Sequence, residues 1–227
     1  MESFELDRQE VLSYYDKFYS SEDFKYYSDR ITKRFFRGVF SKCGVRPTGK
    51  ILDVGCGTGY YCNIFHELGF EPVGIDFSTT AIEKAKEKYP SLEFHVGDAL
   101  NLPFAPSSFD VVLSYGCSVV STYDLGQIHS YVRHLRSFVK PGGWLLLIGG
   151  SNLSGNRLTT STWLSHTWED LRRFIPECNW RSLGPFLSHV RLVSIVGSLA
   201  LGSAVTFLLR HAGSNLVRTT FHFVQKA

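Results

Sequence analysis

The stretch Ile51-Leu52-Asp53-Val54-Gly55-Cys56-Gly57-Thr58-Gly59-Tyr60 decides which fold the chain is expected to adopt. A short apolar run leads directly into three glycines at alternate positions, and a segment with helical periodicity follows and ends at Gly69. This pattern predicts a buried strand, a tight turn and a helix. Glycine at these positions indicates a backbone that comes close to a ligand or takes a positive φ.

The residues around this turn restrict the kind of ligand. The dinucleotide fingerprint G-x-G-x-x-G needs a third glycine where Tyr60 stands, and no G-K-[ST] sequence follows to form a phosphate loop. Asp53 lies at the expected strand end, where its carboxylate would repel a pyrophosphate and attract an ammonium group. The turn therefore favours a nucleoside with a cationic or zwitterionic end, and S-adenosylmethionine fits that description.

Four segments in order resemble the class I S-adenosylmethionine-dependent methyltransferases, especially the small-molecule branch. Asp53 to Gly59 resembles the family's first signature, and Asp76 sits where the family places the acid that accepts both ribose hydroxyls. Gly97-Asp98-Ala99 resembles the segment that lines the adenine, and Lys140 to Trp144 resembles the turn into the fifth strand. The resemblance covers about residues 48–150.

The resemblance implies an α/β fold: a Rossmann-like, seven-stranded, mostly parallel sheet with an antiparallel last strand and helices on both faces. We expect one methyltransferase domain over residues 1–227. Residues 1–47 would form an N-terminal helical cap, 48–150 the cofactor-binding half, and 151–227 an acceptor-side insertion with the C-terminal strands.

Periodicity predicts where the elements of the cofactor-binding half lie. We expect a helix beginning near Ser78, which is a good N-cap, and another that stops at Pro141-Gly142-Gly143. Strands are expected at residues 51–54, 71–76, 92–96, 109–114 and 144–148.

The last third of the chain is harder to interpret because the resemblance fades there. Residues 151–185 have the pattern of a loop followed by a helix, and residues 192–209 contain no charged side chain. That length suits a membrane span, but Gly197 and Gly202 interrupt it. We therefore expect a strand near 190–196, a buried helix near 200–211 and a final strand over 216–225, with no membrane span. Peripheral contact with a membrane stays open.

The resemblance and the strand ends together define an expected cofactor site. Asp76 would bind the ribose, Phe77 would lie against the adenine, and Asp98 would accept from the adenine amine. A backbone N–H of Ala99 or Leu100 would then donate to a ring nitrogen. The remaining expected cofactor contacts are Tyr15, Asp53, Gly55, Cys56, Gly57, Gly59, Tyr115 and Gly116.

The acceptor is expected beside this site, over the loop that follows the fourth strand. Cys117 and Ser118 lie on that loop, Tyr14 comes from the helical cap, and Trp163 comes from the expected roof. His166 is the candidate general base for a hydroxyl acceptor, although a surface histidine is the more common explanation. No metal site is expected.

Composition excludes several classes of protein. The chain of 227 residues is 44% hydrophobic and 20% charged, which is ordinary for a globular domain. A net charge of +3 with scattered cations argues against nucleic acid. Five cysteines without metal or disulfide spacing, and an acidic start without an apolar segment, favour the cytoplasm.

Three functions compete at this point, and the oligomeric state is unknown. The first is methyl transfer to a small-molecule oxygen or nitrogen acceptor, hydrophobic or like a natural product. The second is a non-catalytic subunit or sensor that binds S-adenosylmethionine. The third, a nicotinamide oxidoreductase, is disfavoured by Tyr60 and Asp53. The family's Asn/Asp-Pro-Pro-Tyr sequence is absent after the fourth strand, which argues against DNA-base and protein-glutamine methylation but does not decide between oxygen, nitrogen and carbon acceptors.

Overall fold

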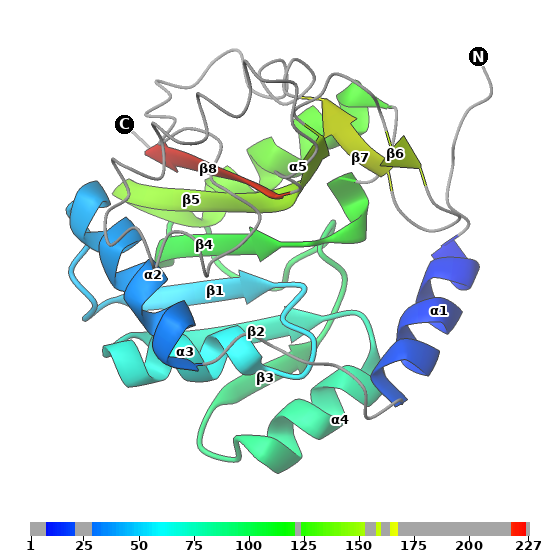
Figure 1. Cartoon of the computed structure of the whole chain (residues 1–227), viewed down its shortest axis with the longest axis horizontal. Coiled ribbons are helices and arrows are strands. Elements are labelled where there is room, and N and C mark those ends of the chain that lie inside the picture. The colour runs from blue at the N-terminus through cyan, green and yellow to red at the C-terminus, as the bar shows by residue number, and fades with distance from the viewer. Residues whose placement is uncertain are drawn as a thin grey trace.

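The computed structural model gives an open α/β fold with helices on both faces of a central sheet (Figure 1). The structure describes residues 8–20, 29–120, 124–152, 158–159, 164–167 and 219–225. The predicted Rossmann-like architecture is confirmed, and the cofactor-binding half lies within these ranges.

Five strands form the parallel part of the sheet. Their spatial order is β3-β2-β1-β4-β5. The first strand is central, β2 and β3 are added on one side of it, and β4 and β5 are added on the other, so the strand order reverses between β1 and β4. Ligands bind at such a reversal, outside the carboxyl ends of the strands. The bounds are β1 Lys50–Val54, β2 Glu71–Asp76, β3 Glu93–Val96, β4 Phe109–Tyr115 and β5 Val139–Asn152.

The boundaries predicted for β1 to β4 agree with these bounds to within one residue. Strand β5 is longer at both ends than the predicted 144–148. Pairing with β4 accounts for its start, because Phe109 is opposite Val139. Pairing with β7 accounts for its far end, because Asn152 is opposite Thr167.

Three further strands follow β5. β6 Leu158–Thr159 is antiparallel to β7 Leu164–Thr167, and β7 runs parallel to β5 with His166 opposite Ser151. The predicted helix is therefore wrong at residues 164–167, where pairing with β5 overrides the helical spacing of the aromatic residues. β8 Thr219–Gln225 is antiparallel to β5. The complete seven-stranded arrangement stays a prediction, because the expected strand at 190–196 and the buried helix at 200–211 lie outside the described residues.

The five α-helices of the described ranges begin and end where local sequence signals allow. Ser78 caps α4 by accepting the Ala81 N–H at 3.1 Å, as predicted. Asp124 caps α5 in the same way. The bounds are α1 Arg8–Ser20, α2 Asp29–Cys43, α3 Tyr60–Leu68, α4 Thr79–Lys88 and α5 Leu125–Phe138.

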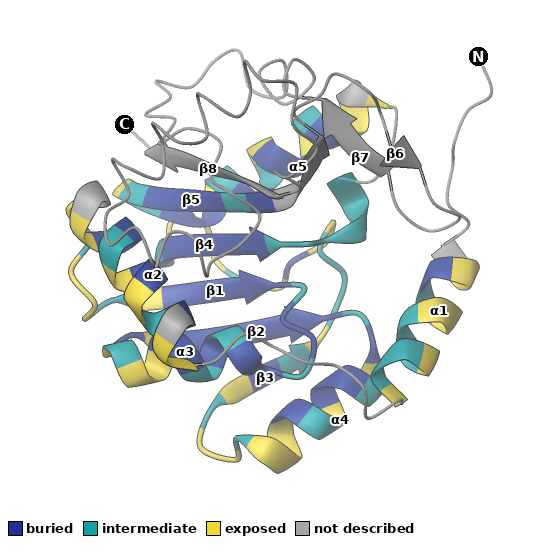
Figure 2. Cartoon of the chain, viewed as in Figure 1, coloured by how far each residue is buried: buried dark blue, intermediate teal, exposed yellow. Residues whose placement is uncertain are grey.

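Two apolar layers cover the two faces of the sheet, and the central strands between them are buried (Figure 2). On one face α5 packs through Tyr131 and Leu135 against Leu52 and Leu145. On the other face α2 and α3 supply an aromatic layer in which Phe36 and Phe65 meet edge to face, with ring centroids 4.8 Å apart. Adjacent residues of β1 therefore point into different layers, as the alternation of a strand requires.

Removal of the Phe36 ring should test how strongly α2 is attached to the sheet. Phe36 is buried and contacts the rings of Phe35, Phe40, Tyr61 and Phe65. We expect Phe36→Ala to lower the free energy of unfolding by about 3–5 kcal/mol, because it leaves a cavity in the aromatic layer.

Urea denaturation measures this change, and Ser41→Ala on the exposed side of the same helix is the control. The control should remain within about 0.5 kcal/mol of the parent protein. An equal change in both variants would contradict the packing role of the Phe36 ring, because alanine favours the helix at both positions.

Candidate functional site

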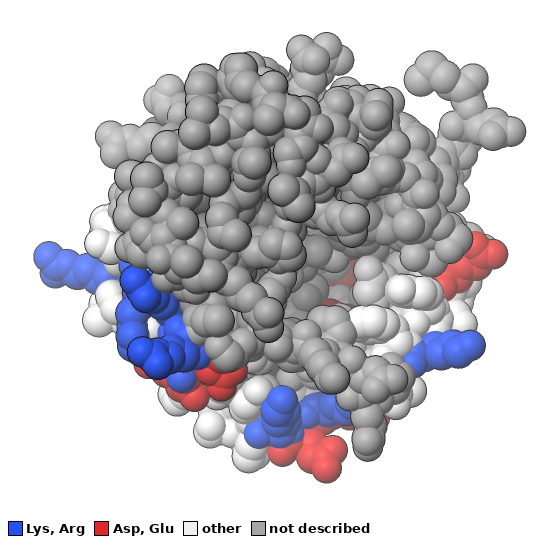
Figure 3. Space-filling model, in the orientation of Figure 1, with Lys and Arg blue, Asp and Glu red and all other residues white. Residues whose placement is uncertain are grey.

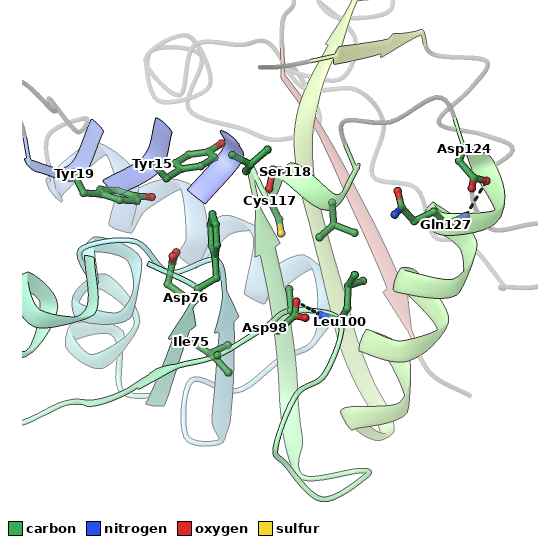
Figure 4. A pocket seen from close by; sticks show the side chains of 17 residues that line it. Tyr15, Tyr19, Ile75, Asp76, Asp98, Leu100, Cys117, Ser118, Asp124 and Gln127 are labelled. Carbon is green, nitrogen blue, oxygen red and sulfur yellow. Dashed lines mark hydrogen bonds between the residues drawn. The ribbon is translucent and has the colours of Figure 1, made fainter. Parts of the chain in front are cut away.

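A cavity of about 300 Å³ lies at the carboxyl ends of the parallel strands, where the strand order reverses (Figure 4). Its volume is at the lower end of the range for small-molecule sites. The lining comes from α1, the glycine turn, the ends of β2, β3 and β4, and the start of α5. The lining residues are Val11, Tyr15, Tyr19, Gly55, Ile75, Asp76, Phe77, Gly97, Asp98, Ala99, Leu100, Gly116, Cys117, Ser118, Val119, Asp124 and Gln127.

Asp76 connects the glycine turn to the end of β2. Its Oδ2 accepts the Gly57 N–H at 2.8 Å, and its Oδ1 accepts the Ser78 N–H at 2.9 Å. Burial raises the pKa of this carboxyl, and the N–H groups of Ser78 and Gly57 oppose that shift. The Phe77 N–H also donates to this carboxylate, but a carboxylate offers about four lone-pair sites, so acceptor capacity remains. Asp76 can therefore accept hydroxyl groups from the cavity while it holds the turn.

The opposite side of the cavity is formed by the segment after β3. Asp98 Oδ1 accepts the Leu100 N–H at 3.0 Å, so this N–H is not free for an adenine nitrogen. Of the two predicted backbone donors, this leaves Ala99. Phe77 also lines the cavity, and its flat aromatic ring suits contact with a purine.

Helix α1 covers the cavity with two tyrosines (Figure 4). The Tyr15 ring meets Phe77 edge to face at 5.8 Å, and burial raises the pKa of its hydroxyl, which stays protonated at neutral pH. Asp16 anchors the helix by accepting the Ser78 hydroxyl at 2.5 Å. The Lys84 ammonium, from α4, also donates to the Tyr19 carbonyl.

The glycines of this region divide into two groups. A Cβ on Gly57 would lie 2.7 Å from the Tyr19 hydroxyl, and one on Gly59 would lie 2.6 Å from the Phe94 ring. Both residues also have positive φ, so packing and conformation together require glycine there. Gly55 and Gly116 line the cavity instead, and a Cβ on Gly116 would meet nothing within 4 Å.

Asp53 does not point into the cavity, which corrects the expected direction of its side chain. It is 1% exposed, and its Oδ2 accepts the Cys62 thiol of α3 at 3.5 Å. The reason is strand alternation: Leu52 and Val54 face α5, so Asp53 faces the opposite layer. Burial raises its pKa to about 7, with a further increase from the Asp76 charge and a decrease from the Cys62 thiol.

The other predicted residues fall into three groups. Cys117 and Ser118 line the cavity, and burial raises the pKa of the Cys117 thiol. The side chains of Tyr14, Cys56 and Tyr115 do not line it, since Tyr14 is 43% exposed and Cys56 packs under the turn with Cys62. Trp163 lies outside the described residues, and for His166 only the backbone position in β7 is described.

Seven lining residues were not predicted individually, although Gly97 and Val119 lie in segments that were expected to line the site. One had a usable signal: Tyr19 lies four residues after Tyr15, on the same face of α1. Asp124 carried the signal of an N-cap, which does not by itself indicate a ligand. The seven are Val11, Tyr19, Ile75, Gly97, Val119, Asp124 and Gln127.

The charges of the lining indicate what the cavity can hold. Asp76, Asp98 and Asp124 contribute carboxylates, and no Lys or Arg of the described ranges lines it. A cationic ligand is therefore favoured over a phosphate. A purine nucleoside with a sulfonium and an amino acid end fits three features of this lining. The Asp76 carboxylate can accept hydrogen bonds from the ribose hydroxyls, the Phe77 ring can contact the purine, and the backbone at Gly55 and Gly116 carries no side chain. No group of His, Cys, Asp or Glu in the described part of the chain is arranged to hold a metal ion.

Comparison with known families agrees with this geometry. Residues 51–143 match the family of methyltransferase domains. A demethylmenaquinone methyltransferase from Renibacterium salmoninarum is 33% identical over 117 residues, which is 51% of this chain and 47% of that protein. Residues 51–143 form a methyltransferase domain of the class I S-adenosylmethionine-dependent type. The resemblance noted from the sequence is thus confirmed, as is S-adenosylmethionine as the cofactor of the domain.

Solved structures show the same fold at low sequence identity. PH0226 from Pyrococcus horikoshii has a TM-score of 0.59 at 17% identity, with 92% of this chain and 93% of that chain covered. An S-adenosylmethionine-dependent methyltransferase from Mesorhizobium loti has a TM-score of 0.57 at 14% identity, with 83% and 96% covered. The chain spans about half the length of the curated relatives it matches. None of the described helices is both long and apolar enough for a membrane span.

The raised pKa of Asp53 predicts a pH-dependent stability. In the folded protein the Asp53 carboxyl keeps its proton up to about pH 7, whereas in the unfolded chain its pKa is the ordinary 3.8. The free energy of unfolding therefore falls as the pH rises from 3.8 to about 7. Asp53→Asn keeps an acceptor for Cys62 and removes the titration. We expect the variant to gain about 2–4 kcal/mol relative to the parent protein between pH 4 and pH 8.

Urea denaturation at several pH values checks this, with Glu83→Gln on the exposed side of α4 as the control. The control should follow the parent curve. Parallel curves for the parent and Asp53→Asn would mean that Asp53 titrates normally in the folded state.

Proposed function

We propose that this protein transfers the methyl group of S-adenosylmethionine to a small apolar molecule, at an oxygen or nitrogen atom. The observation that carries the proposal is the cavity at the strand reversal. The Asp76 carboxylate and the backbone of Gly55 and Gly116 line this cavity, and no Lys or Arg of the described ranges does. The matching methyltransferase domain supports the same reaction.

In this proposal the chain contributes mainly binding and orientation. S-adenosylmethionine supplies an activated methyl group on a sulfonium, so the leaving sulfur needs no stabilisation. Asp76 accepts hydrogen bonds from the ribose hydroxyls, and Phe77 lies against the adenine. Asp98 accepts a hydrogen bond from the adenine amino group. Tyr15 closes the cavity from α1 and excludes water. The rate then depends on how well the acceptor atom is held in line with the methyl group.

Part of the cavity lining favours an apolar acceptor. Val11, Cys117 and Val119 contribute to it, together with Ser118. The relatives that share 29–39% identity carry the name demethylmenaquinone methyltransferase, and we propose an acceptor of similar apolar character for this chain. Tyr14, Trp163 and the possible base His166 belong to the proposed acceptor side.

The remaining expectations belong to the same proposal. Residues 1–227 act as one domain in the cytoplasm, with residues 151–227 completing the acceptor side and a seven-stranded sheet with an antiparallel last strand. The other residues expected at the cofactor, Asp53, Cys56, Gly57, Gly59 and Tyr115, support the glycine turn and the neighbouring strand ends without lining the cavity.

A non-catalytic subunit that binds the cofactor is the second candidate, because the same lining would hold S-adenosylmethionine without any methyl transfer. The full chain should be incubated with methyl-labelled S-adenosylmethionine and a panel of apolar quinols, phenols and amines. Labelled product supports the enzyme, and its mass and NMR spectra identify the methylated atom. Cofactor binding without product in any panel would favour the subunit.

Loss of the Asp76 carboxylate should weaken cofactor binding. We expect Asp76→Ala to lower the affinity for S-adenosylhomocysteine by about 1–3 kcal/mol, the scale for hydrogen bonds to a charged group. Isothermal titration calorimetry measures this. Asp110→Ala is the control, because Asp110 also accepts a backbone N–H, that of Lys50 at 2.8 Å, but from the opposite end of the sheet. Both variants should be less stable, whereas unchanged affinity in Asp76→Ala would remove Asp76 from the ribose role.

A side chain on Gly116 should block the cavity. Gly116 and Gly142 share a positive φ, 61° and 74°, and neither has an atom within 4 Å of an added Cβ. Only Gly116 lines the cofactor cavity. We expect Gly116→Leu and Gly142→Leu to lose similar stability, about 1–2 kcal/mol from the left-handed backbone. Only Gly116→Leu should lose the rise in melting temperature with S-adenosylhomocysteine. A retained shift in that variant would place the ligand elsewhere.

A further inference from the structure

Helix α2 carries a row of exposed arginines on the side that faces away from the sheet. Arg30, Arg34 and Arg37 are all exposed, and their spacing of four and three residues places them on one face of the helix. We call these three residues the basic stripe. Figure 3 shows Lys and Arg side chains gathered over this helix.

Packing fixes the direction of the basic stripe. The opposite face of α2 is buried through Phe36 and Phe40, which contact the Phe65 ring of α3. The Thr32 and Tyr60 hydroxyls add a buried hydrogen bond of 3.0 Å between the same two helices. Because the apolar face of α2 packs in the core, the helix cannot turn the basic stripe inward. For the same reason it has no apolar face left to insert into a lipid bilayer.

The acidic residues near α2 leave the basic stripe uncompensated. Glu67 forms an ion pair with Lys33, which lies beside the stripe. Asp29, at the start of the helix, is close enough to the Tyr60 hydroxyl to raise its pKa, after burial as the main cause. None of the three arginines takes part in an ion pair within the described ranges. Three adjacent guanidinium groups therefore remain available to an external anion.

We propose that the basic stripe of α2 adsorbs the protein to the anionic surface of a lipid bilayer. This inference rests on the proposed function, since an apolar acceptor dissolves in a membrane and an enzyme that uses it gains from a position at the membrane surface. The attraction is electrostatic, through lipid phosphates, and involves no insertion of α2. A single-stranded nucleic acid fits less well, because α2 exposes no aromatic side chain for bases to stack on.

The test measures binding of the full chain to vesicles without any acceptor. Sedimentation with phosphatidylcholine vesicles is compared with sedimentation with vesicles that also contain phosphatidylglycerol. We expect about tenfold or stronger binding to the anionic vesicles at low salt. Raising the salt to about 0.5 M should abolish the difference, because the charges are exposed and screened. Equal binding to both vesicles, or binding that resists salt, would overturn the proposal.

Charge-reversal variants locate the surface. Arg30→Glu, Arg34→Glu and Arg37→Glu together should remove the preference for anionic vesicles. Lys17→Glu, Lys86→Glu and Arg133→Glu change the net charge equally from exposed sites on three other helices, and this control should keep most of the binding. Equal loss in both triple variants would mean that net charge, not the stripe, causes the adsorption.

Two further measurements separate this proposal from other outcomes. The rise in melting temperature with S-adenosylhomocysteine should be the same in the stripe variant and the parent, which shows that the fold and cofactor site are intact. Stripe-dependent binding to single-stranded RNA that is stronger than binding to the anionic vesicles would overturn the lipid assignment. Vesicle binding without methyl transfer to any acceptor would leave the surface established and contradict the proposed function.

Discussion

The two hydrogen bonds of the Asp76 carboxylate are the interaction on which the cofactor cavity depends. They join the Gly57 N–H of the first turn to the Ser78 N–H at the start of α4, beyond the ends of the paired parallel strands β1 and β2. A buried carboxylate is costly unless such donors compensate it. The same residue therefore shapes the turn, sets the start of α4 and presents its remaining lone pairs to the ligand. The N-terminal cap joins this arrangement through Asp16 and Ser78.

The two apolar layers give this arrangement its rigidity. The aromatic layer of α2 and α3 lies beneath the glycine turn on one face, and α5 supports the loop after β4 on the other. The Tyr131 hydroxyl of α5 meets the Ser114 hydroxyl at 2.9 Å, directly below Cys117. The cavity is thus bordered by elements that are far apart in sequence and fixed by separate layers. Rigid borders suit a reaction whose rate depends on alignment.

Charge divides the molecule into two regions with different tasks. The cavity is lined by carboxylates and holds no cation from the described ranges, which suits a cationic cofactor. The outer side of α2 carries the arginines of the basic stripe. Asp53 shows that the charge of a side chain depends on its surroundings. Its carboxyl group lies close to the glycine turn but is buried against Cys62, and with a pKa of about 7 a large fraction of it is protonated at neutral pH.

Local patterns determined much of this protein without any structure. Apolar runs of strand length, the glycine turn and the N-cap at Ser78 gave β1 to β4, α4 and the acids Asp76 and Asp98, because each depends on neighbours within a few residues. Tertiary structure alone decided the direction of Asp53, the role of Tyr19 over Gly57 and the strand at residues 164–167. These depend on which layer a strand residue faces, which helix covers the turn and which strand β5 can pair with. Contacts of this kind join residues distant in sequence, and a local pattern carries no information about them.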